Sequence, residues 1–265
     1  MSLIEAIIIG IVQGLTEFLP VSSSGHIELA KAVLNAQIDD DLLFTVFLHA
    51  ATALSTIVVF RQDILQIFRG ILSFKWDEET RFAWFVVLSM IPAAIVGLKW
   101  KDEIETFFNG NILFVSIMLL VTGLILFISD KIKINKNEEI SGTKALIMGI
   151  VQAIAILPGI SRSGSTIVTG VFLGMNRSKA ARFSFLMVLP LILGVAAKSL
   201  LDYFEQSEAS QQTIPLFELS MGFVAAFITG LFAIKWMIKL VEKSQLTWFA
   251  LYCFIIGIVG IFFSF

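Results

Sequence analysis

Charge is scarce in this sequence. Only 15% of its 265 residues are Asp, Glu, Lys or Arg, whereas 57% are hydrophobic. A soluble domain carries about 25% charged residues, so this chain has too little charge to cover a surface that faces water. A helical membrane span needs about 20 apolar residues, which leaves room for roughly ten segments and no sizeable aqueous domain. Soluble enzyme folds are therefore excluded, and the sequence predicts an integral membrane protein.

Three further absences narrow the class of protein. The formal net charge is only −2, so the chain lacks the basic field that nucleic-acid binding requires. Its single cysteine, Cys253, cannot form an internal disulfide and is expected to pack in the core. No Lys or Arg precedes Lys31, so the basic start of a cleavable signal peptide is missing. We therefore expect the apolar N-terminal run to stay in the mature chain.

Two polar turns interrupt apolar runs that are too short to cross a membrane alone. The first turn, Pro20 to Gly25, separates residues 3–19 from residues 26–34. The second, Pro158 to Gly164, separates residues 145–157 from residues 165–173. Such breaks occur at membrane depth only where the turn is buried in protein or lines a cavity. Both segments are therefore predicted to be re-entrant helical hairpins.

The hairpins belong to an internal repeat. Gly10-Ile-Val-Gln13 returns as Gly149-Ile-Val-Gln152, and Ser24-Gly25 returns as Ser163-Gly164, in both cases 139 residues later. A single membrane domain spanning 1–265 is predicted, with halves at about 1–138 and 139–265. Each half is expected to hold one hairpin and three crossing helices, and the six crossing segments are 42–60, 83–98, 112–129, 182–200, 216–235 and 247–265. Because three crossings are odd, the second half must be inverted, giving an all-α polytopic fold of two inverted repeats.

Basic residues mark one side of this topology. The loops at 61–82, 130–144, 175–182 and 235–245 carry 14 of the 19 Lys and Arg residues, whereas the opposite loops at 35–41, 99–111 and 200–215 carry only Lys99 and Lys101. Acidic residues lie in these opposite loops: Asp39, Asp40, Asp41, Asp202, Glu205 and Glu208. By the positive-inside rule we expect the N-terminus outside, with the first hairpin opening outward and the second toward the cytoplasm.

Polar residues at the two turns indicate an anion site. Gln13 and Glu17 share one helix face, with Glu17 beside the first turn. Ser22, Ser23 and Ser24 can cap the following helix, whose free N–H groups suit an anion. The second turn repeats this with Ser161 and Ser163 and adds Arg162, whose planar fork suits a phosphate. A carboxylate beside such a cradle would repel the anion unless a divalent cation, magnesium or calcium, bridges them.

Each of these residues also has a purely structural interpretation. Glu17 and Arg162 could form a buried ion pair that only locks the hairpins together. His26 could be a hydrogen-bond partner at a helix start or a catalyst, and the serines could be caps or nucleophiles. His49 is expected to be structural or to support the site, and Gln152 to be polar packing.

The two polar segments, Gln13–His26 and Pro158–Thr166, closely resemble the signature motifs of the undecaprenyl pyrophosphate phosphatase family, also called bacitracin-resistance proteins. The likeness extends over the whole chain. It implies a bacterial inner-membrane enzyme that hydrolyses undecaprenyl pyrophosphate to the monophosphate and inorganic phosphate, recycling the lipid carrier for peptidoglycan. It also implies a divalent cation, polyprenyl pyrophosphate and membrane lipids as partners, and leaves a homodimer open.

Site residues carry over from the resemblance by position. Glu17 matches the second acid of the family's Glu/Gln-x-x-x-Glu motif, and Gln13 is the glutamine variant of its first position. Ser23 and His26 match the serine and histidine that act in the family. The second motif places Ser161, Arg162 and Thr166 at the pyrophosphate.

The mechanism expected from these residues uses His26 as the general acid or base, acting on Ser23 or on a water. Arg162, the serine-rich turns and a metal near Glu17 would hold the pyrophosphate, with chemistry on the periplasmic or extracellular side. The alternative is a transporter of a polyprenyl phosphate lipid, because inverted repeats with broken helices are also a transporter pattern.

Overall fold

The computed structural model describes residues 1–36, 41–108, 110–129, 131, 138–205, 216–243 and 245–264. Across these ranges the chain is helical, with no strand beyond one isolated bridge between Glu138 and Met175. The helices in chain order are α1 (Leu3–Thr16), α2 (Ser23–Leu34), α3 (Asp41–Val59), α4 (Arg61–Leu72), α5 (Glu78–Lys99), α6 (Lys101–Glu105), the short 3₁₀ helix η1 (Thr106–Phe108), α7 (Ile112–Ser129), α8 (Gly142–Ile154), α9 (Arg162–Phe172), α10 (Arg177–Glu205), α11 (Leu216–Glu242) and α12 (Thr247–Phe263). The all-α prediction is confirmed.

Within the described ranges, four helices are long and apolar enough to cross a membrane: Glu78–Lys99, Ile112–Ser129, Arg177–Ser199 and Leu216–Glu242. A fifth span is available if the α3–α4 pair, bent by 79°, counts as one. The apolar helix α12 has 17 residues, or about 26 Å at 1.5 Å per residue. The chain is therefore a multi-pass membrane protein, and the full set of six crossings stays a prediction.

One predicted loop is wrong. Residues 61–72 form helix α4 instead of an extended connection, and α5 starts at Glu78. The reason is amphipathic spacing: Ile64 and Ile67 pack against the core, whereas Leu65, Phe68 and Leu72 are exposed. The basic segments at 175–182 and 235–245 are likewise mostly the ends of α10 and α11.

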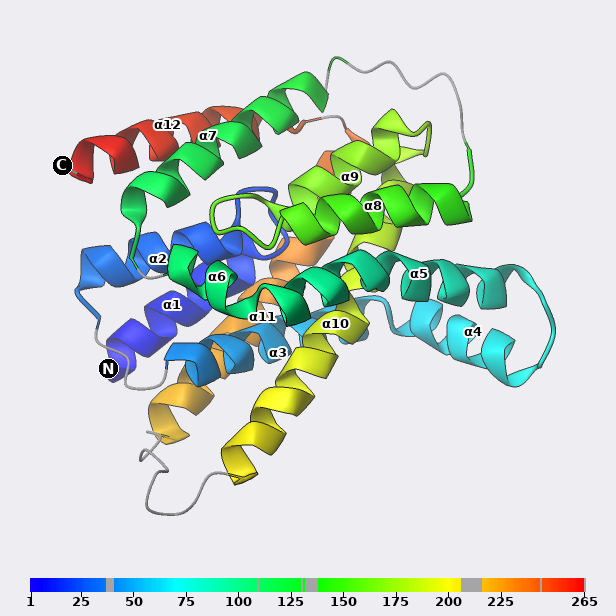
Figure 1. The fold of residues 1–265 in the computed structure, drawn as a ribbon, viewed down its shortest axis with the longest axis horizontal. Helices are drawn as coiled ribbons and strands as arrows, with labels where there is room; N and C mark the ends of the chain where they lie inside the picture. The colour runs from blue at the N-terminus through cyan, green and yellow to red at the C-terminus, as the bar shows by residue number, and fades with distance from the viewer. Residues whose placement is uncertain are drawn as a thin grey trace.

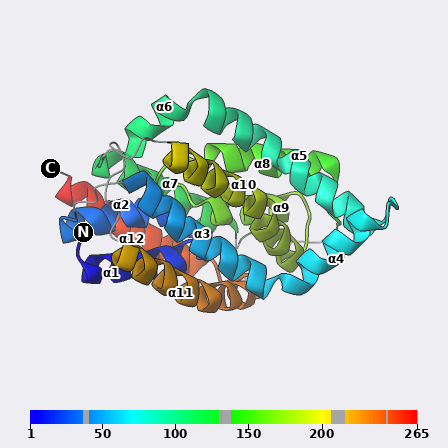
Figure 2. The same ribbon diagram turned by 90° about the horizontal axis from the view of Figure 1, so that it is seen from below.

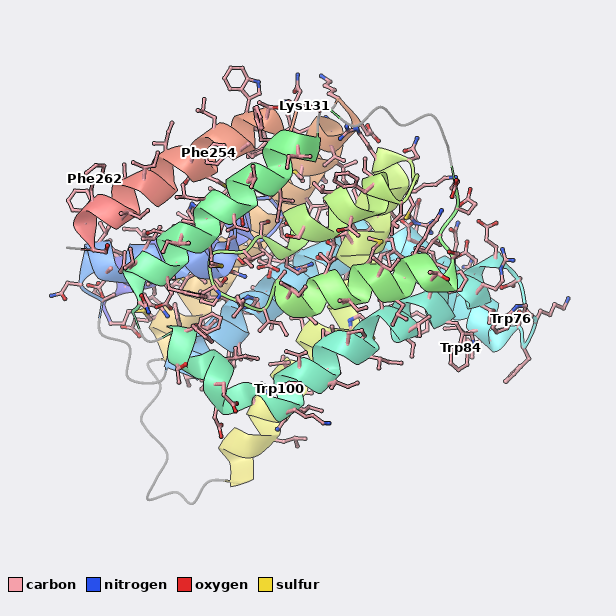
Figure 3. All side chains as sticks on the ribbon, turned by 45° about the horizontal axis from the view of Figure 1, so that its top comes forward. Trp76, Trp84, Trp100, Lys131, Phe254 and Phe262 are labelled. Carbon is pink, nitrogen blue, oxygen red and sulfur yellow. The ribbon has the colours of Figure 1, made fainter. Side chains whose placement is uncertain are left out.

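The topology prediction rests partly on loop charges that lie outside the described residues. These are Asp39, Asp40, Lys133, Lys136 and Glu208. Tryptophans mark where the two membrane interfaces would lie, without saying which of them is outside. Trp76 and Trp84 lie at one end of the molecule and Trp100 lies past the far end of α5 (Figure 3). Trp84 and Trp100 are separated by about 24 Å of helix, which suits the two interfacial belts in which Trp is enriched.

Helices from the two halves pack against each other. α7 and α12 run side by side, and α5 lies along α8 (Figures 1 and 2). α1 packs on α11, where a Cβ added at Gly10 would lie 2.3 Å from the Gly222 carbonyl oxygen. A Cβ added at Gly149 of α8 would lie 2.4 Å from the Ser89 carbonyl oxygen of α5. Gly10 and Gly149 thus make the same kind of close helix contact, although the inverted relation of the halves stays a prediction.

The core holds large apolar side chains from both halves, among them Phe18, Phe183, Phe185 and Met237. Cys253 is fully buried in the same cluster, which confirms that it packs in the core. This packing holds α1 and α9 in place, and these helices adjoin the two polar turns: the first turn follows α1 and the second precedes α9.

Candidate active site

Each polar turn joins two helices that contact each other, α1 with α2 and α8 with α9, and a serine caps the second helix of each pair. That these hairpins are re-entrant in a membrane stays a prediction. Ser22 caps α2, with its hydroxyl oxygen accepting from the Gly25 N–H at 3.3 Å. Ser161 caps α9 in the same way, accepting from the Gly164 N–H at 3.1 Å. The first N–H groups of a helix have no partner within it. Each turn therefore offers backbone donors at the start of a helix, as the sequence predicts.

The two turns meet inside the protein. A Cβ added at Gly25 would lie 3.0 Å from the Gly159 Cα, so the first turn of α2 touches the second polar turn directly. The Ser163 hydroxyl also lies 3.4 Å from the Leu19 carbonyl oxygen. Side chains separated by about 140 residues in the sequence are thereby brought into one polar cluster.

Glu17 is the centre of this cluster. Its Oε1 accepts from Arg162 Nη2 in an ion pair between the two hairpins. Its Oε2 accepts from the Ser23 hydroxyl at 2.6 Å and from Gln13 Nε2 at 3.1 Å. His49 Nε2 lies 3.7 Å from the same oxygen. Glu17 is buried, at 6% exposure, so its charge is balanced inside the protein by these partners.

Two buried polar atoms of the cluster have no hydrogen-bond partner among the residues that the structure describes: Arg162 Nη1 and Gln13 Oε1. An unsatisfied buried group costs about 1–3 kcal/mol, so such atoms point to a binding role. Nη1 is a charged donor that suits a phosphate oxygen. Two side chains of the cluster are partly exposed and can be reached by a ligand: Arg162, at 16% exposure, and His49, at 28%.

His26 bonds to groups other than those around Glu17. Its Nδ1 is 2.8 Å from the Ser22 carbonyl oxygen and its Nε2 is 2.8 Å from the Tyr252 hydroxyl. Neither bond reaches Glu17. Ser22 has a left-handed backbone with φ of 70°, a conformation that costs about 1–3 kcal/mol and is typical of functional sites.

The remaining predicted residues line the turns. Ser24 lies 3.4 Å from Ser22, measured between the hydroxyl oxygens, and Ser163 lies 3.4 Å from Ser161 in the same measure. Thr166 is fully buried, and its hydroxyl lies 2.8 Å from the Arg162 carbonyl oxygen and 2.6 Å from the Ser184 hydroxyl. Through these bonds Thr166 contacts the backbone of Arg162 and not the Glu17 carboxylate.

Sequence reasoning missed three polar contacts. Thr122 of α7 donates to the Gly159 carbonyl oxygen at 2.8 Å and accepts from the Ser161 N–H at 2.9 Å, which holds the second turn. Thr52 of α3 accepts from Gln13 at 3.4 Å. Tyr252 comes from α12, near the end of the chain. No motif marks any of the three, because each lies in an ordinary apolar helix.

The residues present fit a divalent cation only if the substrate supplies ligands. Among the described residues, no group of three or more His, Cys, Asp or Glu side chains is arranged to hold a metal. Glu17 offers one carboxylate, and the unpartnered Gln13 Oε1 offers a second oxygen. Magnesium is usually bound by one or two carboxylates together with substrate phosphates, so this small set is sufficient for a shared cation.

The fold and the cluster define a class: a multi-pass α-helical membrane protein in which two broken-helix turns join a carboxylate to an arginine. The comparison with known families agrees. The family model described as bacitracin resistance protein BacA matches residues 6–259. The chain belongs to this family.

Similar proteins are named undecaprenyl-diphosphatase. One from Christiangramia forsetii is 54% identical over 267 residues, covering 100% of this chain and 99% of the relative. One from Bacteroides fragilis is 48% identical and covers 97% of this chain and 96% of the relative. One from Methanobrevibacter smithii is 39% identical, covering 98% and 96%.

Proposed function

We infer that this protein is an undecaprenyl-diphosphatase, a hydrolase that converts undecaprenyl pyrophosphate to undecaprenyl phosphate and inorganic phosphate. The reaction recycles the lipid carrier for peptidoglycan synthesis and confers bacitracin resistance. Full-length relatives of this name support the activity, and so does membership of the family. The names do not favour the transporter alternative.

One observation carries the chemistry: Glu17 and Arg162 pair between the two turns while Arg162 Nη1 stays without a partner. Arg162 binds a phosphate oxygen through Nη1 and keeps Glu17 through Nη2. The first N–H groups of α2 and α9 and the hydroxyls of Ser24 and Ser163 bind further phosphate oxygens. Fixed donors of this kind stabilise the charge that develops as the terminal phosphoryl group transfers.

Glu17 accepts a proton from the attacking group in this mechanism. Support comes from the Ser23 hydroxyl, which already donates to Glu17 Oε2 at 2.6 Å. The attacking group is Ser23 or a water held in the same direction, and Ser23→Ala separates the two. His26 exchanges a proton with the phosphate through Nε2, because the Ser22 carbonyl occupies its other ring nitrogen.

A divalent cation, magnesium or calcium, would be held by Glu17 and Gln13 together with the pyrophosphate oxygens. When bound, it would neutralise phosphate charge next to the carboxylate. We place the protein in the bacterial inner membrane with the first hairpin open to the periplasmic or extracellular side, on the strength of the loop charges. Homodimerisation stays a prediction.

Phosphate release from purified protein tests this function. The protein in detergent is given undecaprenyl pyrophosphate with magnesium or calcium, and with a chelator as the metal-free arm. We expect release by the parent, loss in Glu17→Gln and Arg162→Ala, and no release with the chelator. An inactive parent would rule out the enzyme, and full activity of Glu17→Gln would rule out the site.

A further inference from the structure

The hydrogen bonds of His26 assign its protons. The Ser22 carbonyl oxygen, 2.8 Å from Nδ1, can only accept, so Nδ1 carries a hydrogen. In the neutral ring Nε2 is then an acceptor, and the Tyr252 hydroxyl donates to it at 2.8 Å. The two rings also stack, with centroids 5.5 Å apart and planes inclined by 13°.

Tyr252 controls access to the one nitrogen of His26 that can exchange a proton. His26 is 9% exposed, with Nδ1 against the Ser22 carbonyl oxygen and Nε2 against the Tyr252 hydroxyl. Tyr252 is 40% exposed. The Tyr252 oxygen therefore offers a path for a proton that leaves or reaches Nε2.

A tyrosine hydroxyl can serve both protonation states of the ring without any movement of heavy atoms. It donates to neutral Nε2, and it accepts from Nε2–H when the ring is charged, by turning its own hydrogen outward. The Ser22 carbonyl accepts from Nδ1–H in both states. The arrangement is thus already suited to passing a proton.

Helix α12 holds Tyr252 firmly against the first hairpin. The neighbouring residue, Cys253, is fully buried with its Sγ 4.0 Å from the Pro20 carbonyl oxygen. α12 also lies along α7 (Figure 1), and α7 holds the second turn through Thr122. The tyrosine is therefore attached to both turns of the site by way of its helix.

We propose that Tyr252 is the proton relay between His26 and the pyrophosphate, which rests on the proposed function. Charged His26 gives its Nε2 proton to the Tyr252 oxygen while the former hydroxyl proton passes to an oxygen of the departing phosphate. One N–H bond and one tyrosine O–H bond break, and a new tyrosine O–H bond and a P–O–H group form. Both side chains end neutral, and His26 is reprotonated from solvent through Tyr252 while Glu17 releases to solvent the proton that it took from the attacking group.

Removing the hydroxyl alone tests the relay. Tyr252→Phe keeps the stacked ring but removes the hydroxyl bonded to the buried His26 Nε2, so the unfolding temperature should fall by only about a few degrees. We expect kcat for phosphate release from undecaprenyl pyrophosphate to fall about 100-fold, the lower end of acid–base effects, while KM changes less than about twofold. Ile255→Ala, an exposed residue one turn further along α12, is the matched control and should keep the parent kcat.

A double variant separates a shared step from two independent losses. Tyr252→Phe with His26→Ala should be no slower than His26→Ala alone, because residues that act as a unit are not additive. A parent kcat in Tyr252→Phe would show that the tyrosine only packs, and a raised kcat would show that it blocks the ring. Either result overturns the relay, as does a multiplied loss in the double variant.

A second measurement covers the case in which Tyr252→Phe does not fold. The chain has only two tyrosines, so Tyr203→Phe lets 3,5-difluorotyrosine mark position 252 alone. A more acidic phenol should shift the pH profile of kcat, and an unshifted profile overturns the relay. Failure of the parent to release phosphate would instead refute the proposed function, so the two failures are distinguishable.

Discussion

Replacing Arg162 by alanine tests what the ion pair with Glu17 does. The Glu17 carboxylate, which is 6% exposed, would keep Ser23, Gln13 and His49 as neighbours. It would lose the permanent positive charge of Arg162. Removing one partner of a buried pair costs about 3–5 kcal/mol. At about 2–4 °C per kcal/mol for a chain of this size, the unfolding temperature should fall by roughly 10 °C.

A double variant separates stability from catalysis. Glu17→Gln with Arg162→Leu removes both charges, and a buried pair replaced by uncharged groups is often neutral for stability. We expect its unfolding temperature to return to within a few degrees of the parent, by the same reasoning, with no phosphate release. Arg162→Lys, which keeps the charge without the planar fork, should recover stability better than activity.

The assay pairs unfolding with turnover in the same detergent preparation. Intrinsic fluorescence of the five tryptophans follows unfolding, and phosphate release from undecaprenyl pyrophosphate follows activity. An unchanged unfolding temperature in Arg162→Ala would refute the stabilising role of the pair. If the double variant kept the parent activity, the proposed phosphate site would be refuted, and the ion pair between Glu17 and Arg162 would have a structural role only.

Three further predictions concern the scaffold. Gly149→Ala should cost about 1–3 kcal/mol, because its Cβ would lie 2.4 Å from the Ser89 carbonyl oxygen; Gly97→Ala, with nothing within 4 Å, is the control in thermal unfolding. Thr122→Val should cost about 1–3 kcal/mol by leaving two backbone groups of the second turn unpaired, whereas the serine variant should keep the parent unfolding temperature. A backbone N–H at the start of α5 donates to Asp77 and holds the pKa of that carboxyl below its ordinary value. The stabilising effect of the charged carboxylate is thus present at neutral pH and lost below about pH 4. Asp77→Asn should therefore weaken the dependence of unfolding on acid pH. The same acid dependence in the variant and the parent would contradict this prediction.

Local patterns in the sequence were enough to predict the hairpins. The N-caps Ser22 and Ser161 and the breaks after α1 and α8 follow from short-range rules about polar turns. The meeting of Glu17 with Arg162 was open to prediction because few ionisable side chains are buried among the described residues.

The partners of His26 and of the second turn could not be predicted in the same way. Tyr252 is 226 residues from His26, and Thr122 is 37 residues before Gly159. Such pairings depend on which helix faces meet, and apolar helices carry little sign of that. Helix α4 was predicted as a loop because the segment contains charged residues. Its apolar residues nevertheless recur with the spacing of one helix face.

The chemistry of the two turns differs where their sequences are matched. Residues 139 positions apart play equal parts in capping: Ser22 and Ser161 accept from Gly25 and Gly164. The next matched pair, Ser23 and Arg162, both donate to one carboxylate. The position matched to that carboxylate, Glu17, is occupied by Ile156. A site with one acid between two helix N-termini has a single carboxylate that can take the proton of the attacking group, and that carboxylate lies at the first turn. Two equivalent turns would suit a ligand passed from one side to the other, whereas one acid fixes where a phosphate is attacked. The asymmetry therefore favours hydrolysis over transport as the role of the buried cluster.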